Sequence, residues 1–248
     1  MRVAVVTGAN KGIGFAIVKQ LCKEFSGTVI LIARDEQKGQ EAVRQLSSEG
    51  LSPTFHQLDI VSPESIEKIK KYLMEQYGGL DLLVNNAGIA FKRASTVPFP
   101  EQAIVTIQTN FHGTLNVCRA LLPILKPHAR DVKDGTHSQK GWSSTAYGIS
   151  HLGIIALTKI LARNITQDSR EDILINACDP GWVRTDMAGP KATKSPEEGA
   201  LTPVYAALLP INVGKPQGEF LKKKMIQEWE EMSTRSHASE AEERLKKE

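Results

Sequence analysis

The stretch that decides the fold is Thr7-Gly8-Ala9-Asn10-Lys11-Gly12-Ile13-Gly14, which follows a short apolar run and precedes a segment with helical spacing. Its three glycines permit a tight turn and let backbone N–H groups approach a pyrophosphate closely, and the start of the following helix adds its positive dipole end. A plain strand-to-helix turn would rarely need three glycines. The stretch therefore predicts a dinucleotide-binding loop between a first strand and a first helix.

Strands and helices are expected to alternate outward from this loop. The pattern predicts strands at residues 3–7, 28–33, 54–58, 80–84 and 173–178, an edge strand at 219–221, and helices at 12–25, 37–48, 62–77, 101–125, 147–164 and 195–208. Ser62 and Ser195 each precede a proline, which is typical of a helix start. The alternation predicts an α/β fold of a single domain, with a Rossmann-like, doubly wound parallel sheet.

Composition and charge exclude several other classes. Of the 248 residues, 41% are hydrophobic and 24% are charged, as in globular proteins and unlike disordered, collagen-like or coiled-coil chains. The net charge of +3 and the lack of a basic stripe predict no nucleic-acid partner. Three scattered cysteines fit a reducing compartment, and no apolar run approaches the ~18 residues of a membrane span. We expect a cytoplasmic protein with no membrane partner and no metal site.

Residues 126–146 break the alternation, because Val132 and Trp142 are their only large apolar residues. We expect no buried strand there, so that one helix directly follows another and one central strand of the sheet is missing. From Lys222 the chain is dense in charges of both signs, which indicates a solvated helix or tail. We assign residues 1–229 to the dinucleotide-binding domain and residues 230–248 to a charged C-terminal tail.

Further motifs follow the glycine loop in a fixed order. They are Asn85-Asn86-Ala87-Gly88 after the fourth strand, Asn110 in the long helix, Tyr147 at a later helix start, and Pro180-Gly181-Trp182-Val183-Arg184-Thr185 after the next strand. With the Gly-x-x-x-Gly-x-Gly spacing, this set resembles the short-chain dehydrogenase/reductase family. Residues 10–14, 55–59, 86–92 and 180–198 are similar to the cytosolic NADPH-dependent carbonyl reductases of that family, and the resemblance covers nearly all of residues 1–229.

The resemblance implies a role for each matched residue. Tyr147 would be the general acid, and Asn110 would position the water of a proton relay. Asp59 would bind the adenine amino group, Asn86 would lie against the adenosine ribose, and Val183 and Thr185 would meet the nicotinamide carboxamide and a nearby phosphate. The implied cofactor-binding set is Gly8, Asn10, Lys11, Gly12, Ile13, Gly14, Arg34, Asp59, Asn86, His151, Val183 and Thr185. The implied substrate-binding set, which matches a region that contacts glutathione conjugates in such reductases, is Phe91, Lys92, Arg93 and Gln102.

Several of these residues also have a simpler interpretation. Asp59 could end a strand or cap a turn, Asn110 could be a polar helix residue facing water, and Tyr147 could pack on the sheet. A 2′-phosphate needs cations near the adenosine ribose, so Lys11 and Arg34 favour NADPH/NADP over NAD. The acid beside them, Asp35, is expected to cap the next helix rather than to bind a ribose hydroxyl.

Two catalytic elements of the family are absent. In short members of the family, a serine ends the strand before the tyrosine, and the corresponding position here is Asp134. We interpret the missing strand and serine as the result of a deletion. The family's Tyr-x-x-x-Lys becomes Tyr147-Gly148-Ile149-Ser150-His151, where i+4 spacing places His151 on the same side of the helix as Tyr147. A histidine is mostly neutral at pH 7, so it would lower the tyrosine pKa far less than a lysine does.

The resemblance implies an enzyme that reduces ketones, aldehydes or quinones to alcohols with NADPH, impaired by these departures. Its partner would be a small-molecule carbonyl substrate, and a monomer is favoured. The alternatives are a non-catalytic NADPH-binding protein or truncated isoform, and a chain that does not fold stably. Without the central strand, residues 173–178 are expected either to pair with residues 80–84 or to leave a cleft open.

Overall fold

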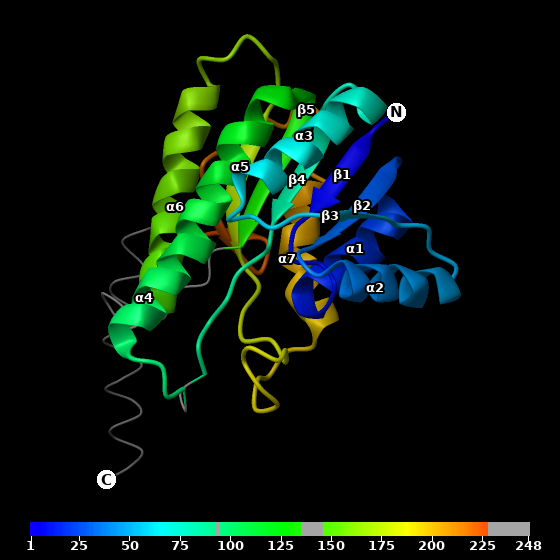
Figure 1. Cartoon of the computed structure of the whole chain (residues 1–248). Helices are drawn as coiled ribbons and strands as arrows, with labels where there is room; N and C mark the ends of the chain where they lie inside the picture. The colour runs from blue at the N-terminus through cyan, green and yellow to red at the C-terminus, as the bar shows by residue number, and fades with distance from the viewer. Residues whose placement is uncertain (93–94, 135–145, 228–248) are drawn as a thin grey trace.

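The computed structural model describes residues 1–92, 95–134 and 146–227 (Figure 1). Its strands are β1 (Val3–Val6), β2 (Thr28–Ala33), β3 (Thr54–Gln57), β4 (Leu80–Asn85), β5 (Leu125–Asp134), β6 (Leu174–Asp179), β7 (Phe220–Lys222) and β8 (Met225–Ile226). Its helices are α1 (Gly12–Glu24), α2 (Glu36–Ser48), α3 (Pro63–Tyr77), α4 (Phe99–Ile107), α5 (Thr114–Leu121), α6 (Ala146–Ile165) and α7 (Pro196–Ala207). A π-helical segment, η1 (Gln108–Gly113), and a 3-10 turn, η2 (Leu122–Ile124), flank α5.

The strands form one sheet in the order β3-β2-β1-β4-β5-β6-β7-β8. Neighbouring strands are parallel except for β8, which runs antiparallel to β7 at the edge. The order reverses direction at β1 and β4, as in a doubly wound sheet, and this confirms the predicted Rossmann-like α/β class. The carboxyl ends of the strands point to the lower side of Figure 1.

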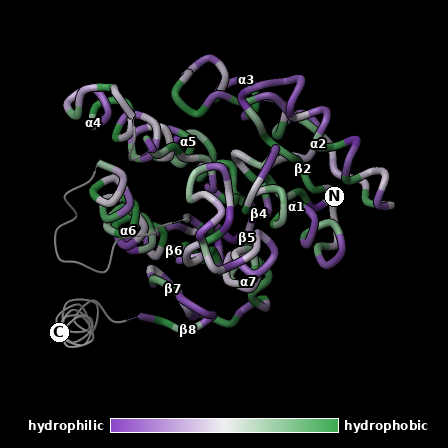
Figure 2. Tube along the Cα trace, turned by 90° about the horizontal axis from the view of Figure 1, so that it is seen from below, coloured by the Kyte–Doolittle hydropathy of each residue, from purple (hydrophilic) through white to green (hydrophobic). Residues whose placement is uncertain are grey.

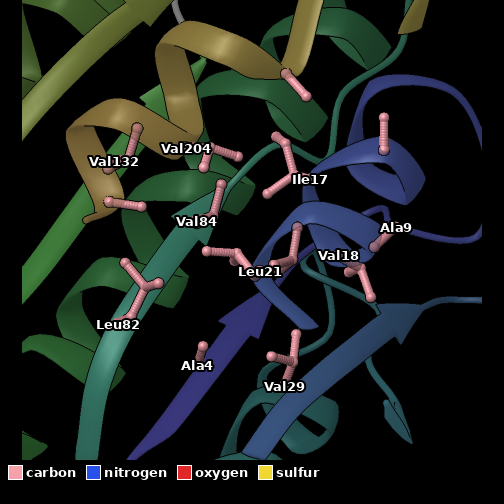
Figure 3. Close-up of a cluster of buried hydrophobic side chains, with 14 of the residues drawn as sticks. Ala4, Ala9, Ile17, Val18, Leu21, Val29, Leu82, Val84, Val132 and Val204 are labelled. Atoms are coloured by element: carbon pink, nitrogen blue, oxygen red, sulfur yellow. The ribbon is translucent and has the colours of Figure 1, made fainter. Parts of the chain in front are cut away.

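Apolar side chains cover both faces of the sheet. On one face α1, α2 and α7 bury a cluster with the strands, part of which Figure 3 shows: Ala4, Ile17, Leu21, Val84, Val132 and Val204. On the other face α3, α5 and α6 bury a second cluster that includes Val5, Ile32, Ile69, Leu83, Val117 and Ala162. Figure 2 shows α7 on one side of β4 and β5 and α4, α5 and α6 on the other. A sheet buried on both faces explains why β1 and β2 are continuous apolar runs.

Helix starts follow the predicted capping residues. The Ser62 side chain accepts a hydrogen bond from the Ser65 N–H at the start of α3. At α7, Ser195 and Glu198 form the complete capping box. Asp35 accepts a hydrogen bond from the Lys38 N–H at 3.0 Å and caps α2, as expected, and this bond lowers the pKa of its carboxyl. Side-chain oxygens at these positions satisfy N–H groups that the first helical turn leaves unpaired.

The expectation of a missing central strand is wrong. β5 lies between β4 and β6, with Val132 opposite Val84 on one side and Asn176 on the other. Residues 173–178 therefore neither pair with residues 80–84 nor leave a gap, and a strand separates η2 from α6. The prediction failed because backbone groups make the ladder bonds whatever the side chains are, and because the polar side chains of β5 find partners inside the protein.

The partners of the polar β5 side chains lie on both faces of the strand. Arg130, on the face of Val132, donates to the Asp172 carboxylate at 3.0 Å and to the Pro210 carbonyl at 2.7 Å. On the opposite face the Lys133 ammonium binds the Asp131 carboxylate, and both side chains are fully buried. The other Asp131 oxygen accepts from the Asn85 amide at 2.9 Å. Paired charges of this kind are the condition under which ionic groups occur in a core.

The predicted long helix over residues 101–125 is also interrupted. It is divided into α4, η1, α5 and η2, and it ends before Leu125, which begins β5. The π-helical segment η1 contains Asn110. Insertions of this kind inside helices often occur at functional sites.

Candidate active site

One large cavity, of about 1480 Å³, opens at the carboxyl ends of the strands. Ligands of open parallel sheets bind in this crevice, next to the point where the strand order reverses. The cavity is lined by all the predicted catalytic and cofactor-binding residues and by one substrate-binding residue: Gly8, Asn10, Lys11, Gly12, Ile13, Gly14, Arg34, Asp59, Asn86, Lys92, Asn110, Tyr147, His151, Val183 and Thr185. Residues that are far apart in the sequence therefore meet where a dinucleotide would bind.

The glycine loop is packed too tightly for side chains. Gly8 has a φ of +62°, and a Cβ atom there would lie 2.7 Å from the Ala87 Cα atom. A Cβ atom on Gly14 would lie 2.4 Å from the Asn86 amide nitrogen, which itself donates to the Thr7 and Gly8 carbonyls at 2.9 and 3.1 Å. The loop is thus held against the end of β4 with the start of α1 facing the cavity. These residues fit the phosphates of a dinucleotide cofactor.

Charged side chains of both signs line the cavity. Asp59 binds the Val61 N–H at 3.1 Å, so it caps a turn and also lines the cavity. Lys11 forms an ion pair with Asp186 at 2.6 Å, and its hydrogen bond and charge keep the pKa of the Asp186 carboxyl below its usual range. Arg34 lines the same cavity after β2. Lys11 and Arg34 thus line the same cavity, and the Lys11 ammonium is paired with Asp186 in the segment after β6.

Asn110 is buried and connects two parts of the site. Its amide oxygen accepts from the Ile89 N–H at 2.8 Å, and its amide nitrogen donates to the Ile89 carbonyl at 2.9 Å and to the Ser150 hydroxyl at 3.1 Å. Asn110 therefore holds the segment after β4 against α6, rather than facing solvent as a surface helix residue would.

Tyr147 and His151 lie against each other on the first turns of α6. Their ring centroids are 4.1 Å apart, with an interplanar angle of 37°. The His151 Nδ1 atom is 2.9 Å from the Tyr147 carbonyl oxygen, which can only accept, so Nδ1 carries the proton and donates. The predicted i+4 contact is present, with an imidazole where the family has an ammonium.

The segment after β6 lines the cavity next to the glycine loop. Val183 is buried and pairs with Lys194 in an isolated β-bridge. A Cβ atom on Gly12 would lie 3.1 Å from the Thr185 Cγ2 atom, so this segment contacts the glycine loop directly. Val183 and Thr185 therefore line the cavity beside the start of α1.

The remaining predicted substrate residues are less closely connected to the cavity. Phe91 and Gln102 are not among its lining residues, and the Gln102 amide donates to the Val97 carbonyl at 2.7 Å. Arg93 lies outside the described residues. Their contribution to a substrate site stays a prediction.

Sequence analysis missed several cavity residues, including Asp179, Trp182, Asp186 and Lys222. Asp179, Trp182 and Asp186 had a signal, because they lie in or next to the Pro180–Thr185 motif. Lys222 had none, because it begins a run of lysines that resembles a solvated tail. Within residues 1–92, 95–134 and 146–227, no group of three or more His, Cys, Asp or Glu side chains could hold a metal ion. No helix in those ranges is both long and apolar enough to cross a membrane.

Comparison with known proteins agrees with this geometry. Residues 2–196 match the family model described as short chain dehydrogenase. The chain is 50% identical over 271 residues to carbonyl reductase [NADPH] 1 of Rattus norvegicus, covering 92% of this chain and 98% of that protein. It is 49% identical over 273 residues to carbonyl reductase [NADPH] 1 of Homo sapiens, covering 92% and 99%.

Solved structures show the same likeness. Salutaridine reductase from Papaver somniferum superposes with a TM-score of 0.79 at 26% identity, covering 89% of this chain and 99% of that one. A variant of actinorhodin polyketide ketoreductase with NADPH superposes with a TM-score of 0.75 at 26% identity, covering 90% and 95%. The family match extends over most of the chain, and the glycine loop, Asn110 and Tyr147 all line one cavity, so the chain belongs to the short-chain dehydrogenase family.

Proposed function

We propose that this chain reduces ketones, aldehydes or quinones to alcohols with NADPH. The observation that carries the proposal is the placement of Tyr147 on α6, in the same cavity as the glycine loop and Asn110. The identity of about half of all aligned positions to carbonyl reductases that use NADPH supports it.

The chemistry divides between the cofactor and the protein. Bound NADPH supplies a hydride to the carbonyl carbon. The Tyr147 hydroxyl donates a proton to the carbonyl oxygen as the new C–H bond forms, which completes the alcohol. Asn110 positions Ser150 and the Ile89 backbone beside this reaction site. The His151 ring lies against the Tyr147 ring and lines the same cavity.

The same site also supports slow turnover. Where the family has a lysine, His151 offers no permanent charge to lower the pKa of Tyr147. The position of the family's serine falls at Asp134, the last residue of β5. We therefore propose an impaired reductase, with a non-catalytic NADPH-binding protein as the alternative.

Parallel measurements of binding and turnover separate the two. NADPH binding is followed by tryptophan quenching, and NADPH oxidation is followed with isatin and with a quinone. Saturable binding with substrate-dependent oxidation supports the reductase. Saturable binding with no oxidation above the substrate-free rate supports the non-catalytic alternative.

NADPH is expected to bind about tenfold more tightly than NADH. A charge-assisted contact with the 2′-phosphate contributes roughly 1.5–3 kcal/mol, and about 1.4 kcal/mol corresponds to tenfold. Titration of both nucleotides by thermal shift or tryptophan quenching measures the difference. Arg34→Gln should remove most of the preference, whereas Lys38→Gln, an exposed cation that pairs with Asp35, should keep it. Equal affinities of the unmodified chain for the two nucleotides would contradict the assignment of Lys11 and Arg34.

The remaining expectations are also proposals. Residues 1–229 form the catalytic domain, and residues 230–248, which lie outside the described residues, form a charged tail. The protein acts in the cytoplasm as a monomer on small-molecule carbonyl compounds. The described part of this domain forms one sheet with two shared core clusters, which supports a single domain over that range.

A further inference from the structure

An ion pair joins the ends of two neighbouring strands beside the active site. Asp179 ends β6, Lys222 ends β7, and the two residues are directly opposite each other in the parallel register. The Lys222 Nζ atom lies 3.1 Å from the Asp179 Oδ2 atom. Both residues line the cavity, and the Asp179 side chain is only 12% exposed. The pair is therefore partly shielded from solvent, unlike an ordinary surface ion pair.

The second oxygen of Asp179 holds the loop that follows. Asp179 Oδ1 accepts a hydrogen bond from the Gly181 N–H at 2.7 Å. Gly181 has a φ of +83°, so the chain turns sharply at this point. One carboxylate thus binds β7 through one oxygen and the start of the loop through the other.

Hydrogen bonds from Lys194 connect the following residues of the loop to this turn. Lys194 donates from its side chain to the Pro180 carbonyl at 3.0 Å, and its backbone N–H donates to the Trp182 carbonyl at 3.0 Å. These bonds set the position of Val183, whose side chain is wedged against Gly199 at the start of α7. Because Val183 and Thr185 lie two and four residues after Gly181, a rotation at Gly181 would move both of them in the cavity.

We propose that the Asp179–Lys222 pair is a positioning device for residues 181–185, which fixes them against the nicotinamide end of the bound cofactor. The proposal rests on the proposed function for its consequence in catalysis, but not for its effect on the loop. Lys222 fixes the rotation of the Asp179 carboxylate, and the carboxylate fixes Gly181. Lys222 is a positioning residue, since it acts through Asp179. Small displacements of groups that orient a substrate can slow a reaction about a hundredfold.

The test uses Trp182, which lies in the loop. In a Trp142→Phe/Trp229→Phe background it is the only tryptophan of the chain, since the sequence has three. Its fluorescence anisotropy decay reports local motion of the loop without any turnover. Lys222→Met should at least double the fast-decaying fraction, weaken NADPH binding about threefold and slow single-turnover hydride transfer at saturating NADPH about fivefold.

Matched variants identify the interaction. Asp179→Asn keeps an oxygen for the Gly181 N–H but loses the ion pair, so it should match Lys222→Met, and the double variant should show no further loss. Lys222→Arg should restore the unmodified values. Lys224→Met, on the same hairpin with its ammonium over the Tyr205 ring, should leave all three readings unchanged.

Two outcomes would overturn the proposal. One is an unchanged Trp182 anisotropy decay and NADPH affinity in Lys222→Met. The other is additive losses in the Asp179→Asn/Lys222→Met double variant, which would mean that the two residues act separately. Absence of hydride transfer in the unmodified chain would contradict the proposed function instead, and the anisotropy would still decide the positioning role.

Discussion

Lys133→Met is expected to lower the free energy of unfolding by about 3–5 kcal/mol, because it leaves the Asp131 carboxylate charged and buried without its ammonium partner. Both side chains are fully buried between β5 and the helices on that face. Asp131→Asn should be similarly harmful, since it leaves the ammonium alone. Urea unfolding followed by circular dichroism measures the loss.

The Asp131→Asn/Lys133→Met double variant is the decisive control. It removes both charges, keeps an unbranched side chain at residue 133, and retains an oxygen that can accept from the Asn85 amide. Replacing a whole buried pair by uncharged groups is often neutral or stabilising, so the double variant should recover at least half of either single loss. Lys71→Met, which breaks an exposed pair with Glu75 on α3, should change the free energy of unfolding by less than about 0.5 kcal/mol. Additive losses in the double variant would show that the two charges do not stabilise each other.

The Asp131–Lys133 ion pair also makes the stability of the protein depend on pH. Burial alone would lower the pKa of Lys133, but the charge of the Asp131 carboxylate outweighs this effect and raises the pKa. Burial raises the pKa of the Cys118 thiol itself to about 12, so the thiol stays protonated. The contribution of Lys133 is therefore fully present below its unfolded pKa of about 10.4 and is lost as the pH rises through the folded value.

β5 is the strand that could not be predicted from local sequence patterns. Most strands could be predicted because apolar runs between helical segments are usually buried as strands in the sheet of an α/β domain. Residues 126–134 carry one large apolar side chain, and their burial depends on partners distant in the sequence: Asn85, Asp172 and Pro210. No local pattern contains these pairings. The same holds for the π-helical segment at Asn110, whose contacts with Ile89 and Ser150 bridge three elements.

The site was more predictable than the sheet. The glycine loop, Asn86 and Tyr147 occur in short motifs whose spacing is set by the elements that carry them, so their meeting in one cavity follows from the alternation of strands and helices. The cap at Asp35 was also predictable, because its position before α2 favours one, and the structure confirms it. Lys222 could not be found in this way, because its partner Asp179 lies 43 residues earlier and only the register of β6 and β7 brings them together.

His151→Lys is expected to raise carbonyl reductase turnover about tenfold or more. The His151 ring already contacts Tyr147, with a centroid separation of 4.1 Å, so a side chain from this position reaches the phenol. A cation ~5 Å from the hydroxyl, at an effective dielectric constant of ~20, is worth roughly 3 kcal/mol, or about two pKa units. A phenol with a lower pKa is a stronger acid, and part of that gain appears in the rate of proton transfer.

The measurement is turnover of isatin and of a quinone at saturating NADPH, from pH 6 to pH 9, for the unmodified chain and for His151→Lys. His151→Gln is the matched control, since it also carries no charge and should give no gain. His151→Lys combined with Tyr147→Phe should lose the gain, because the phenol is the group on which the cation acts. If NADPH binds His151→Lys normally and turnover does not rise, the missing charge is not what limits this site, and the aspartate at the position of the family's serine, Asp134, becomes the remaining explanation.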